Sequence, residues 1–431
     1  MTHPISILGV LDSGPDDLSM TARKRLSEAE LVLAEDRFLH LYGPVMAVDA
    51  EKRSYSRRLN ELPHWLRQAM EEQRRVVVLA TGDPLFHGLA AYLADKLPSG
   101  SLDVLHQVST LQVAFARLTL PWSHARLVSL HRADGGDWDD EADFAHPLYP
   151  LWRALDDGNL VGVLTSPENT PQRIARMLVR LGWEEHWHMH VGQRLGRADE
   201  RVDRDIPPQV GVEREFLHPN VVILERRRPA RDGRLPTLGW PDEFYQKKVF
   251  AKGLITRREV RAMVLAHLTI TDGDILWDIG AGSGSVGLEA AGLTPNGQVW
   301  AMEKNEESVH HIRDNRQRMR RYNYRIDHGT APEGLEHWPD PDGIFIGGSG
   351  GGLEALLALS LARLKPNGRL VVNLVALENL TRTLQWLDQH RFPWGLIQTG
   401  GSVSQPLASM HRLEPQAPVW IITVNKESPS P

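Results

Sequence analysis

The residues best suited to bind a ligand form a glycine-rich turn at residues 278–284, DIGAGSG. The turn follows an apolar run typical of a strand and precedes small residues typical of a helix. Glycines let the backbone approach a ligand closely, and a helix N-terminus can bind an anion. Glu303 ends the next predicted strand, where a carboxylate can accept hydrogen bonds from both hydroxyls of a ribose. The pattern predicts a site for a ribose-containing ligand.

The glycine spacing separates two families of such sites. The nicotinamide-dinucleotide fingerprint needs a third glycine or alanine where this chain has Ser285, so that fingerprint fails. Gly-x-Gly-x-Gly followed by Glu303 instead resembles the class I S-adenosylmethionine (SAM)-dependent methyltransferases. This resemblance implies SAM as cofactor, held by Asp278, Gly280, Gly282, Gly284 and Glu303. A dinucleotide oxidoreductase, and a turn used only for packing, are the alternatives.

A second glycine-rich loop, GGSGGG at residues 347–352, follows another predicted strand. Many class I members that methylate nitrogen carry an acidic or amide residue, two prolines and an aromatic residue here. This loop offers no side-chain base, but its backbone N–H groups suit carboxylates. An electron-rich carbon needs no base before it attacks a sulfonium methyl, so positioning can supply much of the rate. The alternative is a loop that binds nothing.

The N-terminal half has a weaker signal. The apolar run at residues 76–80 ends in TGDP at residues 81–84, where Pro84 fixes a turn. Asp83 has a role beyond forming this turn only if a ligand lies above it. His131 follows another apolar run, and it either faces a cleft or serves as a structural histidine.

The elements that position these residues alternate between strands and helices, which predicts an α/β fold. In the C-terminal half they form a doubly wound, Rossmann-like parallel sheet. We expect strands at residues 275–279, 299–302, 343–346 and 370–373, with helices running to residue 291 and over 306–321 and 353–364. In the N-terminal half we expect strands at residues 76–80, 160–164 and 221–224 and a helix over 172–181.

Length and composition indicate two domains. A chain of 431 residues exceeds one ordinary core. A segment rich in Arg, Pro and Gly predicts a linker at 226–239, between domains at 1–225 and 240–431. A net charge of −6 argues against a nucleic-acid partner. We expect a cytoplasmic protein, because no signal peptide or membrane-length apolar run is present.

Two tracts could suggest metal binding. His186, His188 and His190 lie close together, but no neighbouring carboxylate or thiol completes a site, and the chain has no cysteine. The acidic residues 134–141 lack the spacing of a calcium loop. We therefore expect no bound metal.

Taken together, the motifs resemble two families of the cobalamin pathway. Residues 252–262, 278–289 and 346–351 resemble the methyltransferases that methylate C15 of a corrin precursor and decarboxylate an acetate side chain. Residues 82–88, 108–112, 129–132 and 167–171 resemble the tetrapyrrole methylases that act at C5. The resemblance spans nearly the whole chain and implies a two-lobed tetrapyrrole methylase fold followed by the class I fold.

The resemblance also implies a function. We expect an enzyme that methylates precorrin-6B at C5 and C15 with SAM and decarboxylates the C12 acetate, giving precorrin-8x. Its alternatives are a methyltransferase acting on RNA or another tetrapyrrole, and a SAM-binding regulator without catalysis. We also expect a homo-oligomer. The resemblance assigns no catalytic residues. The implied cofactor residues are Gly82, Asp83, Pro84, Ser109, Thr110, Thr256, Asp278, Gly280, Gly282, Gly284, Glu303, Gly329, Thr330 and Ala331, and the implied substrate residues are His131, Gly347, Gly348, Ser349 and Gly350.

Carboxylates of such a substrate need cations, because guanidinium groups pair with them in a bidentate manner. The sequence offers Arg37, Arg132 and Arg194 in the first domain and Arg257 and Arg258 in the second. Each of them can equally be an ordinary surface charge.

Overall fold

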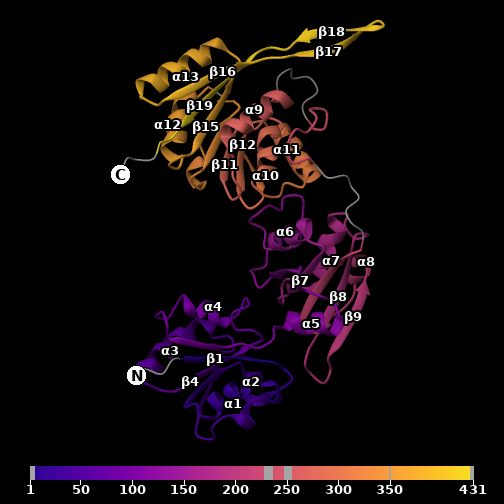
Figure 1. The fold of residues 1–431 in the computed structure, drawn as a ribbon, viewed down its shortest axis with the longest axis vertical. Helices are drawn as coiled ribbons and strands as arrows, with labels where there is room; N and C mark the ends of the chain where they lie inside the picture. Colours follow the sequence, from indigo (N-terminus) through magenta and orange to yellow (C-terminus); the bar gives the residue numbers. More distant parts are fainter. Residues whose placement is uncertain (1–4, 228–235, 247–254, 349–350, 428–431) are drawn as a thin grey trace. The chain divides into compact units, whose positions relative to one another are not determined.

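The computed structural model describes residues 5–227, 236–246, 255–348 and 351–427. The chain packs into two compact units (Figure 1). One comprises Met1–Trp138 and Pro150–Ala230, and the other comprises Asp139–Tyr149 and Arg231–Pro431. Each unit is described by itself. The domain boundaries expected from the sequence, 1–225 and 240–431, stay a prediction.

The first unit begins with a parallel five-stranded sheet in the order β3-β2-β4-β1-β5. Both faces of β1 and β4 are buried, so these strands are nearly continuous runs of apolar residues. Two cores lie on opposite faces of the sheet: α1 and α2 cover one, and α3 and α4 cover the other. The strands are β1 (Ile5–Val10), β2 (Leu31–Ala34), β3 (Glu51–Ser54), β4 (Val76–Thr81) and β5 (Leu102–Leu105), and the helices are α1 (Met20–Ser27), α2 (Asp36–Leu41), α3 (Leu62–Glu71) and α4 (Leu89–Ala94).

A second five-stranded sheet, β6-β7-β10-β8-β9, completes the first unit. Only β6 and β7 run parallel; the other neighbours are antiparallel, which the sequence pattern did not reveal. Helix α5 packs against β7 and β10. The strands are β6 (Arg126–Ser129), β7 (Leu160–Leu164), β8 (Trp187–Gln193), β9 (Arg201–Ile206) and β10 (Asn220–Arg226), and the helices are α5 (Thr110–Leu118), α6 (Tyr149–Asp157), α7 (Pro171–Arg180) and α8 (Pro208–Gly211).

The second unit has a seven-stranded sheet in the order β13-β12-β11-β14-β15-β19-β16. Its first five strands are parallel, and β19 is antiparallel to both neighbours. The order reverses direction between β11 and β14, the place where open α/β sheets bind ligands. The strands are β11 (Ile275–Ile279), β12 (Gln298–Glu303), β13 (Tyr324–His328), β14 (Gly343–Ile346), β15 (Arg369–Leu374), β16 (Trp394–Thr399) and β19 (Val419–Asn425).

Helices cover both faces of this sheet, as a doubly wound fold requires (Figure 1). One core joins the sheet to α9 (Arg258–Leu268), α10 (Ser285–Leu293) and α11 (Glu306–Met319). The other joins it to α12 (Leu353–Arg363) and α13 (Leu377–Gln389). The predicted α/β fold of both halves is confirmed, and the predicted elements occur with ends that differ by a few residues.

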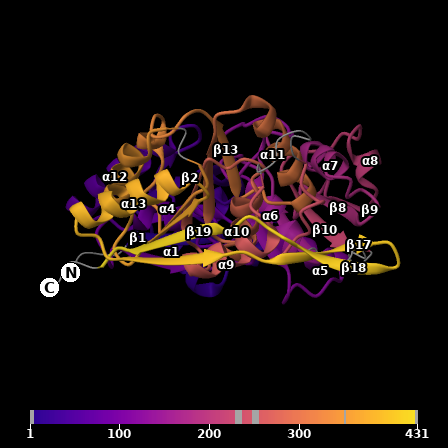
Figure 2. The same ribbon diagram turned by 90° about the horizontal axis from the view of Figure 1, so that it is seen from above.

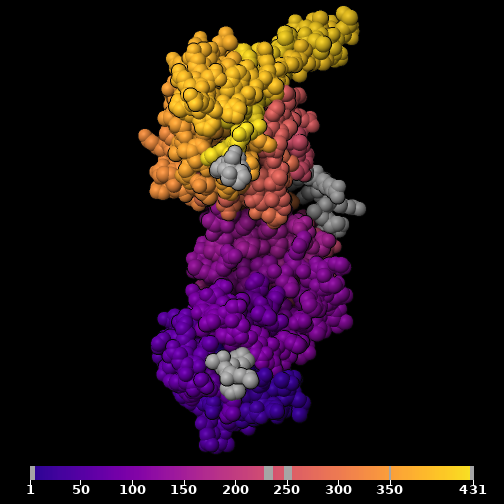
Figure 3. Space-filling view, turned by 60° about the vertical axis from the view of Figure 1, so that its left-hand side comes forward, coloured from indigo at the N-terminus to yellow at the C-terminus, as the bar shows by residue number. Residues whose placement is uncertain are grey.

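A hairpin between β16 and β19 was not predicted. Its strands, β17 (Ser402–Leu407) and β18 (Met410–Pro415), pair with each other and have every residue exposed. Both ribbon views show the hairpin extending beyond the sheet of the second unit, and the space-filling view shows it as a projecting arm (Figures 1, 2 and 3).

Among the described residues, none of the helices is long and apolar enough to cross a membrane.

Candidate cofactor and substrate sites

The glycine-rich turn of the second unit has a backbone that favours glycine. Gly280, Gly282 and Gly284 have φ of 71°, 61° and 73°, which other residues rarely adopt. A Cβ atom on Gly280 would also lie 2.5 Å from the carbonyl oxygen of Gly348. The turn after β11 and the loop after β14 therefore pack backbone against backbone, and this close approach shapes the floor of the site.

Glu303 ends β12 beside this turn. Its Oε2 accepts a hydrogen bond from Gly282 N at 2.9 Å, and its Oε1 accepts one from Asn305 N, also at 2.9 Å. Each carboxylate oxygen can accept a further bond. Glu303 is buried but lines a cavity, so its free lone pairs can meet two hydroxyl groups. The geometry fits the ribose-binding role predicted for it.

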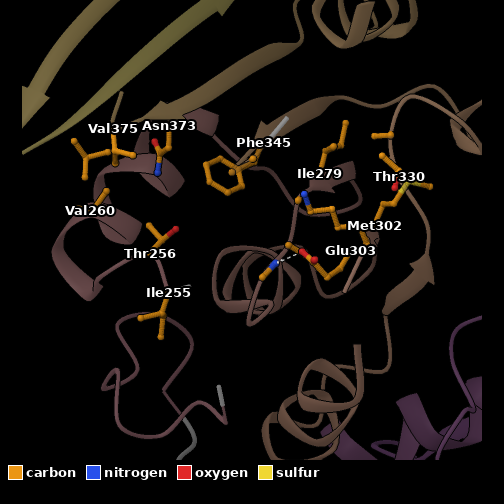
Figure 4. A pocket seen from close by; sticks show the side chains of 18 of the residues that line it. Ile255, Thr256, Val260, Ile279, Met302, Glu303, Thr330, Phe345, Asn373 and Val375 are labelled. Atoms are coloured by element: carbon orange, nitrogen blue, oxygen red, sulfur yellow. Dashed lines mark hydrogen bonds between the residues drawn. The ribbon is translucent and has the colours of Figure 1, made fainter. Parts of the chain in front are cut away.

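The cavity has a volume of about 330 Å³, at the lower end of the range for small-molecule sites. Figure 4 shows Glu303, Met302 and Thr330 at one end and Thr256, Val260, Asn373 and Val375 at the other, with Phe345 and Ile279 between them. Most of the residues predicted for this site are brought together here. They are Thr256, Gly280, Gly282, Glu303, Gly329, Thr330, Ala331, Gly347 and Gly348.

Two predicted cofactor residues do not line this cavity. Gly284 precedes α10 and faces Ile312 and Leu288. Asp278 is buried, and its Oδ2 accepts hydrogen bonds from Gly287 N at 3.1 Å and from the hydroxyl of Tyr324 at 3.2 Å. Burial raises the pKa of Asp278 to about 7. Asp278 thus connects the turn to α10 and β13 through these hydrogen bonds. It supports the turn but does not form a wall of the cavity.

Part of the backbone of the loop after β14 lines the cavity. The N–H of Gly347 donates to the carbonyl of Ile279 at 2.8 Å and is therefore not available to a ligand. Gly348 lines the cavity with open space above its Cα. The predicted substrate residues Ser349 and Gly350 lie outside the described residues.

The sequence reading missed several cavity residues, above all Asn373 near the end of β15. Its Oδ1 atom is buried and has no hydrogen-bond partner among the described residues. A lone asparagine in an apolar strand is a weak signal. Only its position at the carboxyl end of a strand beside the switch point could have indicated a role.

A buried ion pair supports the wall of this cavity. Arg261 on α9 and Glu289 on α10 are fully buried, and Arg261 Nε donates to Glu289 Oε1 at 2.6 Å. Arg261 Nη1 also donates to the carbonyl of Thr256 at 2.6 Å. Glu289 accepts further bonds from Gly239 N, Trp240 N and the Tyr245 hydroxyl. The pair therefore joins both helices to the segment that carries Thr256.

The role of Glu303 can be tested by substitution. Replacing it with alanine removes the acceptor for the ribose hydroxyls, and hydrogen bonds to charged groups contribute about 1.5–3 kcal/mol. We expect the affinity of the second unit for SAM to fall roughly 10- to 100-fold in calorimetric titrations. Glu306→Ala, which removes a carboxylate from the first turn of α11, is the matched control. An unchanged affinity in Glu303→Ala would remove Glu303 from the ribose site.

The first unit has a larger cavity, of about 940 Å³, lined from both of its sheets. Gly82 follows β4 directly with φ of 65°, and its N–H donates to the carbonyl of Val10 at 2.8 Å. Asp83 accepts from Leu85 N at 2.9 Å, the bond of a turn former, and it also lines the cavity. Pro84 is buried and does not line it.

The other predicted residues of this unit meet in the same cavity. Ser109 and Thr110 begin α5, where Ser109 and Gln112 form a capping box. His131 lines the cavity, and its Nδ1 lies 3.0 Å from Ser129 Oγ. Burial and the nearby His87 lower the pKa of His131. The structure brings Gly82, Asp83, Ser109, Thr110 and His131 together, although they come from well-separated segments.

The arginines suggested for carboxylate recognition differ in their surroundings. Arg37 lines the first cavity but is bound to Asp12, Glu35 and Thr81. Arg194 pairs with Asp199, and Arg132 does not line the cavity. In the second unit Arg257 lines the cavity, whereas Arg258 is exposed outside it.

Family models match both halves of the chain. The model described as "Tetrapyrrole (Corrin/Porphyrin) Methylases" matches residues 4–205. The model described as "Precorrin methyltransferase domain" matches residues 248–426.

Curated relatives match either nearly the whole chain or a part of it. The chain is 31% identical over 422 residues to a precorrin-6Y C(5,15)-methyltransferase [decarboxylating] from Sinorhizobium sp, covering 96% of this chain and 94% of the relative. A protein of the same name from Mycobacterium tuberculosis strain H37Rv is 26% identical, with 97% and 99% covered. A cobalt-precorrin-6B C(15)-methyltransferase (decarboxylating) from Salmonella typhimurium is 37% identical, and the match covers 40% of this chain and 90% of the relative.

Proposed function

Because the chain belongs to the family of decarboxylating precorrin-6Y C(5,15)-methyltransferases, we propose that it methylates its precorrin at C5 and C15 and releases CO2, with SAM as methyl donor. The observation that carries this proposal is the match of one relative across both units. The released CO2 comes from the C12 acetate and the product is precorrin-8x, as the sequence resemblance implies. The enzyme acts in cobalamin biosynthesis, and we place it in the cytoplasm.

We assign the C15 methylation and the decarboxylation to the second unit. The Salmonella typhimurium relative, whose name contains only these two activities, matches 40% of this chain. The C5 methylation then belongs to the first unit, where the tetrapyrrole methylase model matches. We further propose domains at 1–225 and 240–431, joined by a linker. One family model, over residues 4–205, lies within the first of these ranges, and the other, over residues 248–426, lies within the second, which supports this division.

The residues of the second cavity fit SAM. Gly280 lets the turn after β11 pack against the backbone of Gly348 beside the cavity, and Glu303 presents a carboxylate to a ribose. When bound, SAM supplies an electrophilic methyl group. The chain's own part is to hold the acceptor carbon in line and to exclude water, which can supply much of the rate. The apolar side chains of Phe345 and Val419 make part of the cavity poorly hydrated, which favours loss of a carboxylate.

In the first unit, Gly82, Asp83, Ser109 and Thr110 are proposed to hold the cofactor, and His131 to contact the substrate. All five line one cavity of about 940 Å³, near the upper end of the range for small-molecule sites. Pro84 acts indirectly, by fixing the turn. In the second unit Asp278 and Gly284 support the cofactor turn from behind, and Gly347 and Gly348 border the substrate.

The experiment that tests the function is turnover by the full chain. Purified precorrin-6B is incubated with SAM, and the product is weighed by mass spectrometry. We expect a product that has gained two methyl groups and lost one CO2. A variant blocked at the second cofactor site, Gly280→Ala, should retain the CO2 and gain at most one methyl group. Loss of CO2 by this variant at the wild-type rate would contradict the assignment of decarboxylation to the second unit.

We also propose that the protein is a homo-oligomer assembled through the β17–β18 hairpin, its partner being a second copy of the chain. Among the described residues these two strands pair only with each other, so both outer edges have unpaired backbone groups. Val403, Leu407, Met410 and Leu413 are exposed on it. Such an edge with apolar side chains favours self-association through a symmetric interface.

The hairpin proposal is tested by light scattering. We expect the wild type to have a mass above that of the 48.5 kDa chain. Replacing Leu407 and Leu413 with serine should shift it toward the single chain. Val48→Ser is the control, because Val48 is 94% exposed in the first unit. A mass that stays the same in the double variant would contradict the role of the hairpin.

A further inference from the structure

The end of the second cavity opposite Glu303 has its own polar groups. Thr256, Val260, Asn373 and Val375 lie there together (Figure 4). Arg257, which follows Thr256, also lines the cavity. Glu303 is the one acidic side chain among the described residues of the lining, so this opposite end has a positive charge and no negative one.

Arg257 has no carboxylate partner among the residues that the structure describes. Its Nη2 donates to the carbonyl oxygen of Ala417, which fixes the direction of the side chain. Its Nε and Nη1 have no hydrogen-bond partner among the described residues. A half-buried guanidinium held in place but not neutralised is suited to pair with an anion.

Asn373 adds a second hydrogen-bonding group. It lies near the end of β15 and lines the cavity together with apolar residues such as Phe345 and Val419. Its Oδ1 is buried without a partner among the described residues. Buried polar groups are ordinarily hydrogen-bonded, so an unpaired Oδ1 means that no bond through this atom fixes the orientation of the amide. A carboxylate cannot donate to Oδ1, but the NH₂ group of the amide can turn toward a carboxylate and donate to it.

The start of α9 is the third feature. Arg257 is the N-cap residue of this helix, and its side chain makes no capping hydrogen bond. Thr256, Arg257 and Val260 all line the cavity, so the first turn of the helix borders it. The N–H of Arg258 in this turn already donates to Asp242 Oδ2 at 3.4 Å. The dipole of the helix adds a further preference for negative charge at its N-terminus.

We propose that Arg257, Asn373 and the N-terminus of α9 form a subsite for a carboxylate of the methyl acceptor. This inference rests on the proposed function, in which the acceptor is a polycarboxylate. The subsite would orient the macrocycle relative to the cofactor, whose ribose is bound at the opposite end by Glu303. A carboxylate held by a cation is stabilised in its ionised form, so the subsite binds a carboxylate that is retained, and the one that leaves lies elsewhere in the cavity.

A carboxylate could also come from the methionine part of SAM, and kinetics separate the two sources. The variants are Arg257→Gln and Asn373→Ala in the full chain, with Arg257→Lys as the variant that keeps the charge. The decarboxylated, methylated product is measured while precorrin-6B is varied at saturating SAM, and then while SAM is varied at saturating precorrin-6B. Arg258→Gln makes the same change in charge outside the cavity and serves as the control.

We expect Arg257→Gln to raise the KM for precorrin-6B by about 10- to 100-fold, the effect of one charged hydrogen bond, with the KM for SAM unchanged. Asn373→Ala should raise the same constant by a smaller factor, and Arg257→Lys should restore part of the loss. A raised KM for SAM with an unchanged KM for precorrin-6B would overturn the inference, and so would unchanged constants for both. A wild-type chain that releases no CO2 would instead contradict the proposed function.

Discussion

Gly280→Ala is expected to abolish SAM binding at the second unit. Alanine is strained at a φ of 71°, and its Cβ would lie 2.5 Å from the carbonyl oxygen and 2.8 Å from the nitrogen of Gly348. Both contacts are with backbone, which cannot rotate away as a side chain can. We expect the affinity for SAM to fall by about 100-fold or more, equivalent to roughly 2.8 kcal/mol.

Calorimetric titration measures this loss directly. The wild type should bind two equivalents of SAM per chain, and Gly280→Ala should bind one. Gly395→Ala is the matched control, because a Cβ atom there meets open space. Two equivalents of unchanged affinity in Gly280→Ala would show that the turn after β11 does not hold the cofactor.

Arg261→Met is expected to have the largest effect on stability. The substitution leaves Glu289 as a buried carboxylate without its cation, and breaking a buried pair in this way costs about 3–5 kcal/mol. It also leaves the carbonyl oxygens of Thr256 and Trp240 without a donor. For a unit of this size the melting temperature should fall by roughly 6 to 20 °C.

Differential scanning calorimetry of the full chain tests this expectation, because each unit should contribute its own transition. The second transition should move and the first should not. Arg258→Met is the control, and as an exposed substitution it should change stability by no more than about 0.5 kcal/mol. The double variant Arg261→Met, Glu289→Leu should lose less than the sum of both single losses, since no unpaired charge remains. Additive losses would show that the two side chains are not coupled.

Local sequence signals predicted much of the second site. The turn at Gly280 and Gly282 depends on residues next to one another, and Glu303 ends the following strand. Neighbours in the sequence suffice to predict such features. The parallel sheet was predicted for the same reason, because each apolar strand is followed by a helix with its own periodic pattern.

The missed features depend on contacts between distant segments. The sequence assigned no role to Arg261 or Glu289, and only the packing of α9 against α10 buries them as a pair. Asn373 becomes a candidate ligand-binding residue only because it lines the same cavity as Phe345 and Val419, which come from two other strands. The hairpin at residues 402–415 has no buried face, so its apolar residues show no alternation that would predict two strands.

The place of β19 in the sheet sets an order for the folding of a growing chain. β19 lies between β15 and β16, although it follows both in the sequence. During synthesis β16 therefore emerges before β19, the strand that joins it to the sheet. The edge of β16 stays unpaired while the hairpin is made. Domains generally fold as units in the order of synthesis, so most of the first unit can fold early. The second unit closes its sheet only when residues 419–425 arrive, and until then its unpaired strands are the part of the nascent protein most exposed to aggregation.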